Sequence, residues 1–471
     1  MSREAAIASA EAYFDSGAFK TDLARRVAIP TESQNPERVA ELKRYIETEI
    51  RPALEAMGFI CRVLTQGKAR GPFLYAERFE DKALPTVLGY GHGDVIRGLE
   101  SGWKDGLSPW QLTEMDGRYY GRGVVDNKGQ HTIDIAGQMA VLKTRGKLGF
   151  NAKWLIEMGE EAGSPGLREL CAEHRDLLAA DVLIGSDGPR LAADRPTIFL
   201  GTRSGFPIDL TIEAREGAHH SGNWGGLLSN PAIQLAHAIA CIVGPTGQIR
   251  IPEWVPDGIP DSVRRALAEC ELTPGPSDPA IDPNWGEPGL TPAEQLYGWC
   301  TFEILAMTSG TPETPVNAVP PRAWARGQLR FVVGVEVDQV LPALRRHLDR
   351  HGFPFVKIAL GGRDEVFAAT RLDPEHPWVQ WAASSMRRTT NQRLAVLPNL
   401  GGSLPNDIFA VGLDLPTIWV PHSYPGCSQH APNEHLPMAI AREGLAIMAG
   451  LYWDLGESGM PPRTLSAKAS P

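Results

Sequence analysis

Apolar residues in the first half of the chain repeat with the spacings of helices and buried strands. Between residues 36 and 57 they recur every three or four positions, at Val39, Leu42, Ile46, Ile50 and Leu54. This spacing predicts an amphipathic helix. Short apolar runs then alternate with helical patterns, which predicts a helix near 129–145 and strands at 86–90, 152–158, 181–185 and 198–201. The alternation is typical of a doubly wound, mostly parallel α/β sheet with helices on both faces.

The pattern changes after Arg203 and returns near residue 372. Strands are expected at 206–214, 301–307, 328–333 and 355–360, with helices at 231–243 and 339–351. Strand–helix–strand–strand–helix–strand is the ferredoxin-like order. A Pro/Gly-rich stretch at 244–298 lacks periodicity and is interpreted as an insertion or long loop. Beyond residue 372 we expect helices at 378–388 and 438–453 and a strand at 417–420.

These patterns predict two domains, one interrupting the other. The larger is an α/β catalytic domain formed by residues 1–204 and 372–471. The smaller is a ferredoxin-like α+β domain at 205–371, with the insertion at about 245–298.

Composition argues against some classes of binding partner and indicates the cellular compartment. The formal net charge of −10, from 46 basic and 56 acidic residues, argues against a nucleic acid or an anionic membrane as partner. No apolar run is long enough to span a bilayer, and the N-terminus lacks the pattern of a secretory signal. The six cysteines are scattered, with no C-x-x-C pair. We therefore expect a reduced, cytoplasmic protein.

Acidic and imidazole side chains cluster at five places in the sequence: His92 with Asp94, Asp126, Glu160 with Glu161, Asp187, and His430. Four of these places lie just beyond a predicted strand of the same sheet, where the ligand sites of parallel sheets form. Two histidines among several carboxylates suit zinc, cobalt or manganese. Because so many carboxylates in one place repel each other without cations, a pair of metal ions is expected.

Eight short motifs occur in one order along the chain: GHGDV, GRGVVDNKG, EEAGS, SDG, HSGNWGG, VNAVP, GGSLP and HAPNE. In this set the chain resembles the M20 family of metallopeptidases, especially its carnosinase-like dipeptidase branch, from about residue 30 to 455. The resemblance implies a homodimer that associates through the smaller domain, which also serves as a lid. It further implies two divalent metal ions per subunit, with zinc expected and manganese or cobalt as alternatives.

The resemblance also assigns roles in the larger domain. His92 would bind one ion and His430 the other, with Asp126 bridging the two and Asp187 and Glu161 completing the separate shells. Glu160 would be the general base. Asp94 would orient the His92 imidazole, and the peptide bond after Asp126 would be cis.

Other motif positions are expected to contact substrate. His220 resembles the residue that stabilises the oxyanion in the neighbouring subunit, and Arg330 resembles one that grips the substrate carboxylate. Asn317 is a candidate for a second oxyanion or substrate contact. Gly401, Gly402 and Ser403 resemble a backbone contact to the substrate terminus. A surface histidine, a surface ion pair and a plain turn are the structural alternatives for His220, Arg330 and the glycines. His422 and His435 are weaker candidates for metal ligands, and the other histidines, His347 and His351 among them, are interpreted as structural or surface residues.

These observations predict a metal-dependent hydrolase that cleaves the amide bond of a small, peptide-like substrate, as a dipeptidase does. Water held between two cations would attack the carbonyl carbon, and Glu160 would take its proton. A deacylase, carboxypeptidase or deaminase acting on an N-acyl amino acid or another non-peptide C–N bond is the alternative. A non-catalytic binding protein on the same scaffold is disfavoured, because the base and all ligand positions are filled.

Overall fold

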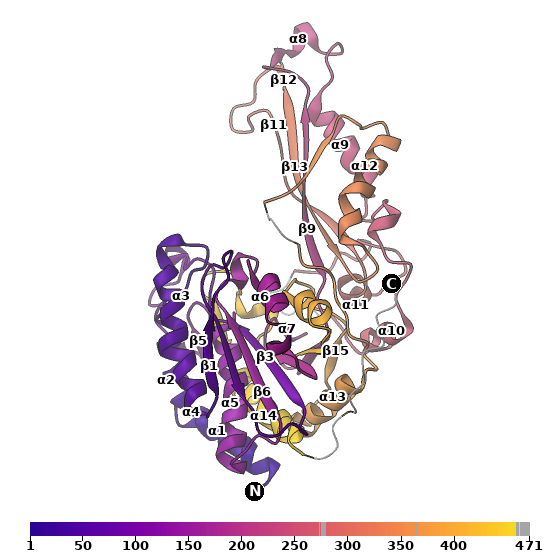
Figure 1. Ribbon diagram of the computed structural model, residues 1–471. Coiled ribbons are helices and arrows are strands. Elements are labelled where there is room, and N and C mark those ends of the chain that lie inside the picture. The colour runs from indigo at the N-terminus through magenta and orange to yellow at the C-terminus, as the bar shows by residue number, and fades with distance from the viewer. Residues whose placement is uncertain (273, 275–278, 363–365, 458–460, 462–471) are drawn as a thin grey trace. The chain divides into compact units, whose positions relative to one another are not determined.

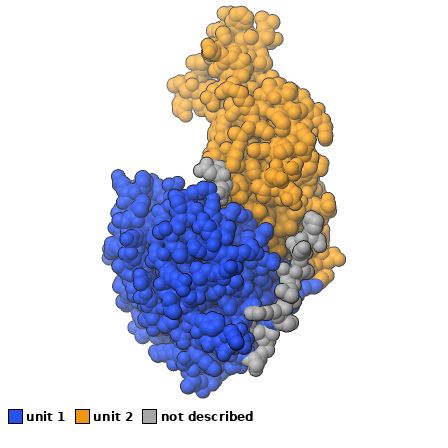
Figure 2. Space-filling model, in the orientation of Figure 1, with its two compact units in different colours: residues 1–201, 372–398, 404–471 blue, residues 202–371, 399–403 orange. Residues whose placement is uncertain are grey.

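The computed structural model describes residues 1–272, 274, 279–362, 366–457 and 461 (Figure 1). The chain divides into two compact units (Figure 2). Unit 1 comprises residues 1–201, 372–398 and 404–471, and unit 2 comprises residues 202–371 and 399–403. Among the described residues no helix is both long and apolar enough to cross a bilayer.

Unit 1 is built on an eight-stranded sheet. In spatial order its strands are β1 (Ile60–Leu64), β2 (Phe73–Arg78), β6 (Asn151–Glu157), β3 (Thr86–His92), β7 (Val182–Gly185), β16 (Thr417–Trp419), β8 (Thr197–Phe199) and β15 (Ala395–Leu397). Strand β3 pairs in parallel with β6 and β7, and β7 pairs in parallel with β16, whereas β1 and β2 form an antiparallel edge. The mostly parallel α/β fold predicted from the sequence is therefore confirmed. The pattern missed β1 because its side chains are largely exposed and show no apolar alternation.

Helices enclose this sheet. They are α1 (Arg3–Asp15), α2 (Ala18–Val27), α3 (Val39–Tyr45), α4 (Arg51–Ala56), α5 (Lys128–Arg145), α6 (Leu167–Glu173), α7 (Arg175–Leu178), α13 (Pro377–Thr390) and α14 (Met438–Leu455). The single helix expected at 36–57 is helical throughout, but a π-helical turn at Ile46–Ile50 separates α3 from α4. Helices α5 and α14 pack on each other and are buried along most of their length, although the buried residues of α5 include polar ones such as Gln130, His131 and Asp134.

A second, three-stranded sheet in unit 1 joins distant segments. It pairs β4 (Thr113–Met115) with β5 (Arg118–Tyr120), and β5 with β17 (His435–Pro437). This pairing brings the chain around residue 430 next to the segment that leads into α5.

Unit 2 has a four-stranded antiparallel sheet in the order β11 (Thr301–Ser309), β13 (Arg322–Phe331), β9 (Ser204–Glu213) and β14 (Lys357–Leu360). With α9 (Pro231–Ile242) and α12 (Val340–Arg350) it has the ferredoxin-like order. Side chains along β13 alternate between buried and partly exposed, as expected for a sheet with one covered face. Helices α9 and α12 pack against each other and share the apolar core of this unit.

The stretch interpreted as an insertion or long loop is not a loop throughout, because it contains short helices. The stretch 245–298 contains α10 (Asp261–Ala268) and α11 (Pro292–Tyr297). Val263 and Leu267 of α10 are buried, and α11 begins with a capping box formed by Thr291 and Glu294. Each helix spans about two turns or fewer, too short for periodicity to stand out among the prolines and glycines around it.

A short segment far along the chain belongs to unit 2. Residues 399–403 contact the start of this unit, where the Arg203 backbone N–H donates to the Leu400 carbonyl. The Arg203 side chain donates to the Gly401 carbonyl at 3.0 Å, and the Ser403 hydroxyl donates to the Arg203 carbonyl at 2.8 Å. Gly402 and Ser403, expected in the larger domain, thus lie in unit 2.

Candidate metal centre

Three neighbouring parallel strands of unit 1 end at the same edge of the sheet and carry polar side chains there. His92 is the last residue of β3, and Asp94 follows it by two positions. Glu160 and Glu161 open a short 3₁₀ turn just after β6, and Asp187 follows β7. Since β6, β3 and β7 are adjacent and parallel, their carboxyl ends bring these side chains to one crevice.

Two groups of three ligands meet at Asp126. Nε2 of His92 lies 3.1 Å from Oδ1 of Asp126 and 3.4 Å from Oδ2 of Asp187. Nε2 of His430 lies 3.0 Å from the other Asp126 oxygen and 3.0 Å from Oε2 of Glu161. In each group the ligand atoms lie within 4.8 Å of one another. We call these five residues the acidic centre, in which Asp126 offers one oxygen to each side.

Buried atoms of the acidic centre have unmet bonding capacity. Within the described part of the chain, His92 Nε2 and Asp187 Oδ2 are buried and make no hydrogen bond. Buried polar atoms usually have partners, so two such atoms facing one point fit a bound cation. The donor set of imidazole nitrogens and carboxylate oxygens suits zinc and similar divalent ions. His430 is 56% exposed whereas the His92 side chain is fully buried, so the centre opens to solvent on the His430 side.

The pKa values of these groups reflect burial and mutual repulsion. Burial raises the pKa of Glu161 to about 7, and the charge of Asp126 adds to the shift. Burial also raises the pKa of Glu160 and of Asp187 above the usual carboxyl range. Burial opposes ionisation of Asp126 too, but its contacts with His430 and His92 lower its pKa. Contacts with Asp126 and Glu161 in turn raise the pKa of His430 to about 11. In the absence of cations, protons therefore balance part of the carboxylate charge.

Asp94 links the two sides of the crevice. Its carboxylate accepts hydrogen bonds from the backbone N–H groups of Glu160 and Glu161, both at 3.1 Å. Nδ1 of His92 lies 3.1 Å from the Asp94 carbonyl oxygen and 3.4 Å from its carboxylate. The imidazole is thus held by the backbone of Asp94 as well as by its side chain, and Nε2 is left facing Asp126 and Asp187.

Glu434 holds the Asp126 loop and received no role from the sequence. Its fully buried carboxylate accepts from the backbone N–H groups of Val125 and Asp126 at 3.0 and 3.2 Å, and from Arg122 at 2.7 Å. The next peptide bond, Asp126–Asn127, is cis, as expected. Acidic side chains that are buried usually have a partner. Glu434 lies in the HAPNE motif, and its place in that motif was the sequence signal from which a role could have been predicted.

Glu160 belongs to neither ligand group within the described residues. Its pKa is raised by burial, lowered by His92, and raised again by Glu161 and Asp187. The carboxyl group is therefore close enough to sense the acidic centre without being one of its ligands.

The histidines that flank His430 in sequence make other contacts. His422 is buried, with Nε2 3.3 Å from the Ser186 hydroxyl, and His435 Nδ1 lies 3.0 Å from the Asn433 carbonyl. Neither is in a potential metal-binding group of the described chain.

His220 and Asn317 come together in unit 2. His220 lies on the short strand β10 (His219–His220), which pairs with β12 (Ala318–Val319) so that His220 is opposite Ala318. The Ser221 N–H and hydroxyl both donate to the Asn317 carbonyl, at 2.8 and 3.1 Å. The His220 and Asn317 side chains are exposed.

Arg330 and Ser403 converge over Gly205, also in unit 2. A β-carbon on Gly205 would lie 3.2 Å from the Ser403 hydroxyl and 3.4 Å from Nη1 of Arg330. Arg203 lies nearby: burial lowers its pKa to about 10, and the charge of Arg330 adds to that shift. Nη1 of Arg203 is buried without a hydrogen-bond partner. Two guanidinium groups in one place favour an anionic ligand, and Arg203 had no motif to signal it.

Comparisons with known proteins show which family this chain resembles. The sequence model of peptidase family M20/M25/M40 matches residues 88–454. The Beta-Ala-His dipeptidase of Homo sapiens is 34% identical over 406 residues, which cover 82% of this chain and 78% of that protein. The Beta-Ala-His dipeptidase of Mus musculus is 35% identical over 184 residues, and this match spans 38% of this chain and 37% of that protein.

One solved structure shows how far the fold is shared. The M20 family metallo-carboxypeptidase Sso-CP2 from Sulfolobus solfataricus superposes with a TM-score of 0.77 at 23% sequence identity. The match covers 93% of this chain and 99% of that one. Likeness at this level of identity concerns the fold.

Proposed function

This chain belongs to peptidase family M20/M25/M40, and we propose that it is a dinuclear metallohydrolase that cleaves the amide bond of a dipeptide-like substrate. The observation that carries this proposal is the pair of ligand groups that share Asp126. The reaction is metal-dependent hydrolysis of a C–N bond in a small, peptide-like molecule.

Each side chain of the acidic centre has a place in this scheme. His92 and Asp187 would hold one ion, His430 and Glu161 would hold the other, and Asp126 would offer one oxygen to each. Zinc suits the set best, with manganese or cobalt as alternatives. When bound, such a pair polarises the scissile carbonyl and lowers the pKa of an attacking water.

Glu160 carries the proton in this mechanism. Its carboxylate takes a proton from the attacking water and passes it to the leaving nitrogen. Its position beside the ligands, without being one of them, supports this role, because the group stays free to exchange protons. Asp94 acts through others: it fixes the His92 ring and the backbone of Glu160.

The substrate carboxylate binds at Arg330, with Ser403 and the Gly402 backbone beside it. The pair of guanidinium groups supports this assignment, since an anion between them relieves their repulsion. Arg330→Ala is expected to raise KM roughly 10- to 100-fold, the equivalent of losing a charge-assisted hydrogen bond. Dipeptides with an amidated C-terminus provide the control. They lack the carboxylate that Arg330 would bind, so their KM should be the same for the wild type and Arg330→Ala. An equal rise in KM for both substrates would contradict this role of Arg330.

The protein acts as a cytoplasmic homodimer that associates through unit 2. The free state of all six cysteines supports a reducing compartment. Near His220 and Asn317 lie the exposed apolar side chains of Trp224, Leu227 and Val316, which favour a contact with a second copy. In that dimer His220 stabilises the oxyanion in the partner's site, with Asn317 as a further contact.

A mixing experiment tests the shared site. His220→Ala and Glu160→Gln are each expected to be inactive as homodimers. After subunit exchange, a mixed dimer has one intact site, so an equal mixture should recover about a quarter of wild-type activity. Unchanged inactivity in a mixture shown to contain mixed dimers would contradict the role of His220.

A substrate panel tests the reaction itself. Purified protein is assayed on dipeptides, N-acyl amino acids and longer peptides, before and after treatment with a chelator. Dipeptides should be hydrolysed fastest, and activity should vanish on chelation and return with zinc, manganese or cobalt. Faster turnover of N-acyl amino acids would favour a deacylase, and faster turnover of longer peptides a carboxypeptidase.

A further inference from the structure

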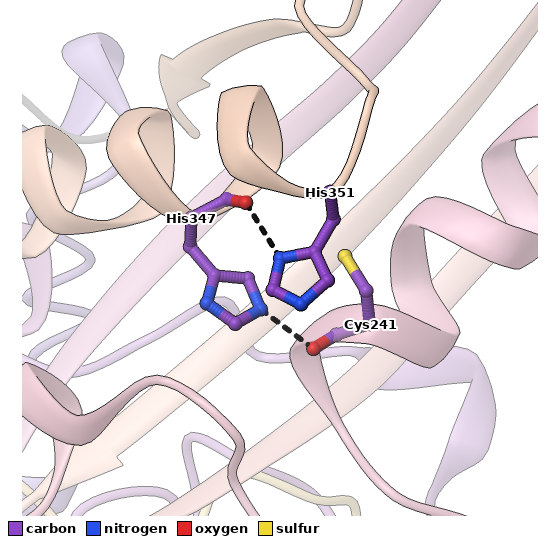
Figure 3. Close-up of side chains that lie close together, drawn as sticks. All are labelled: Cys241, His347 and His351. Carbon is purple, nitrogen blue, oxygen red and sulfur yellow. Dashed lines mark hydrogen bonds between the residues drawn. The ribbon is translucent and has the colours of Figure 1, made fainter.

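A second type of ligand group lies in unit 2, outside the acidic centre. Cys241 lies in the last turn of α9, while His347 and His351 lie four residues apart at the end of α12 (Figure 3). One ligand atom of each side chain lies within 4.8 Å of the other two. We call these three residues the Cys241 group. They meet because α9 and α12 pack against each other.

Hydrogen bonds hold the two imidazoles in place. His351 Nδ1 lies 2.8 Å from the His347 carbonyl oxygen, which makes Nδ1 the protonated nitrogen and leaves the Nε2 lone pair available. His347 Nε2 lies 2.7 Å from the Cys241 carbonyl oxygen. The ring centroids are 4.2 Å apart, and the Cys241 thiol lies beside the His351 ring (Figure 3). His351 thus has the usual arrangement of a metal-binding histidine, in which one ring nitrogen donates to a backbone carbonyl and the other is left for the metal.

We propose that Cys241, His347 and His351 bind a divalent zinc-class ion, with solvent as the fourth ligand. One sulfur and two imidazole nitrogens suit zinc or cobalt, and disfavour magnesium and calcium, which prefer oxygen. Bonds of about 2.0–2.3 Å place tetrahedral ligand atoms roughly 3.3–3.6 Å apart. Small rotations of the half-exposed thiol and the exposed His351 ring bring the three atoms to that spacing.

Charged side chains of both signs lie near the Cys241 group. Burial raises the pKa of the Cys241 thiol, whereas nearby Arg250 lowers it and favours the thiolate that metals bind. Near His347, Glu253 offers a negative charge and Arg350 a positive one. On binding, Cys241 releases its proton to solvent, and His347 moves its proton from Nε2 to Nδ1, so the ring stays neutral.

The bound ion links two helices. Because Cys241 is on α9, His347 is on α12 and His351 caps the end of α12, the ion ties together elements that the core already packs. His351 is exposed, so the ion enters directly from solvent. This site is independent of hydrolysis by the acidic centre.

Cobalt provides a probe that separates the two sites. The full chain is stripped with a chelator and titrated with Co²⁺ alone. Thiolate bound to cobalt gives a near-ultraviolet charge-transfer band, and neither ligand group of the acidic centre contains a cysteine. Wild-type protein should show this band and bind one more ion per chain than His351→Ala. The variants His351→Ala and Cys241→Ser should lose the band.

Matched variants control for nonspecific binding. His237 is an exposed histidine on α9, and Cys61 is a half-exposed thiol in unit 1. His237→Ala and Cys61→Ser should keep the band and the extra ion. Circular dichroism establishes that each variant is folded. If Cys241→Ser fails to fold, His351→Ala carries the test.

The outcomes distinguish this site from the hydrolase proposal. A wild-type protein that binds cobalt without a thiolate band overturns the Cys241 group as a metal site, whatever its activity. A band that persists in folded His351→Ala also overturns it. A band in a protein without hydrolase activity supports the Cys241 group and counts against the proposed function alone.

Discussion

The acidic centre of unit 1 and the Cys241 group of unit 2 assemble their ligands in different ways. In unit 1 the ligands come from separate loops, and three of the four ligand-bearing segments before residue 200 lie at or just after the end of a strand. In unit 2 they come from the ends of two packed helices, with two of the three a single turn apart. Loops at strand ends leave room for several ligands to surround two ions, whereas a helix face offers ligands to one side of a single ion.

The two groups also differ in charge. Asp126, Glu161 and Asp187 bring three carboxylates into a mostly buried crevice, where burial raises the pKa of Glu161 and of Asp187. The Cys241 group is neutral when its thiol is protonated, and both of its imidazoles already bond to carbonyl oxygens. The acidic centre therefore carries charge that bound cations would balance, whereas the Cys241 group is neutral and its imidazoles are hydrogen-bonded without one.

The largest effect is expected from Glu160→Gln, which separates the catalytic step from metal binding. Turnover should fall roughly 10²- to 10⁴-fold, the usual contribution of a general acid–base group. Metal content, measured by elemental analysis, should not change in either unit, because Glu160 is not a ligand. Glu173→Gln, an exposed glutamate on α6, serves as the control and should retain activity. Full turnover of Glu160→Gln with its metals bound would exclude Glu160 as the base.

A second test concerns Glu434, which holds the Asp126 loop in place. Glu434→Gln removes the charge that the Asp126 loop and Arg122 share, and it should weaken metal binding by the acidic centre about 10- to 100-fold. Binding at the Cys241 group should stay the same. Competition with a chromophoric chelator measures both affinities.

Glu443→Gln is the matched control for this test, since it also takes a carboxylate from a buried arginine, Arg190. It is expected to lower stability while leaving metal affinity intact. An equal loss of affinity in the two variants would mean that Glu434 acts only through general stability.

The pH dependence of metal affinity should separate the two groups further. Between pH 6 and 8, His430, with a pKa raised to about 11, and the Cys241 thiol, with a pKa raised by burial, hold protons that the ion must displace. Affinity at both sites should therefore fall about tenfold per pH unit for each displaced proton as pH decreases. Glu161, with a pKa near 7, takes up an additional proton below that pH.

The acidic centre should thus show a steeper fall in affinity below pH 7 than above it. Chelator competition at half-unit intervals checks this difference. The same slope above and below pH 7 at the acidic centre would contradict the additional proton on Glu161.

The smallest effect concerns stability. At a hundredfold excess over its dissociation constant, an ion stabilises the fold that binds it by about 2.7 kcal/mol. For a unit of this size the Tm should rise by roughly 5–10 °C. An Asp126→Asn variant, impaired at the acidic centre, should keep a zinc-dependent rise in Tm that disappears when His351→Ala is added. Calorimetry with and without zinc measures the shift, and a rise that survives in the double variant would count against the Cys241 group.

Much of the fold was predictable because local periodicity reports local burial. The strands that end near His92 and Asp187 were read from short apolar runs, and the ferredoxin-like order of unit 2 from its alternating segments. Helices α10 and α11 were missed because elements of so few residues leave no clear period. The ligand-bearing motifs could be recognised in the sequence because only a few residue types can act as metal ligands.

The amino-acid sequence alone identifies the family and the imidazole and carboxylate groups that could bind metal. Which of these groups lie together depends on how the chain folds. Strand order places His92 beside Asp187 and leaves Asp126 between two histidines, and helix packing brings Cys241 to His347, 106 residues away in the chain. The contact of the Glu434 carboxylate with the backbone N–H groups of Val125 and Asp126 likewise depends on the tertiary structure. Such contacts depend on how separate elements pack, and no local pattern of apolar and polar residues carries that information.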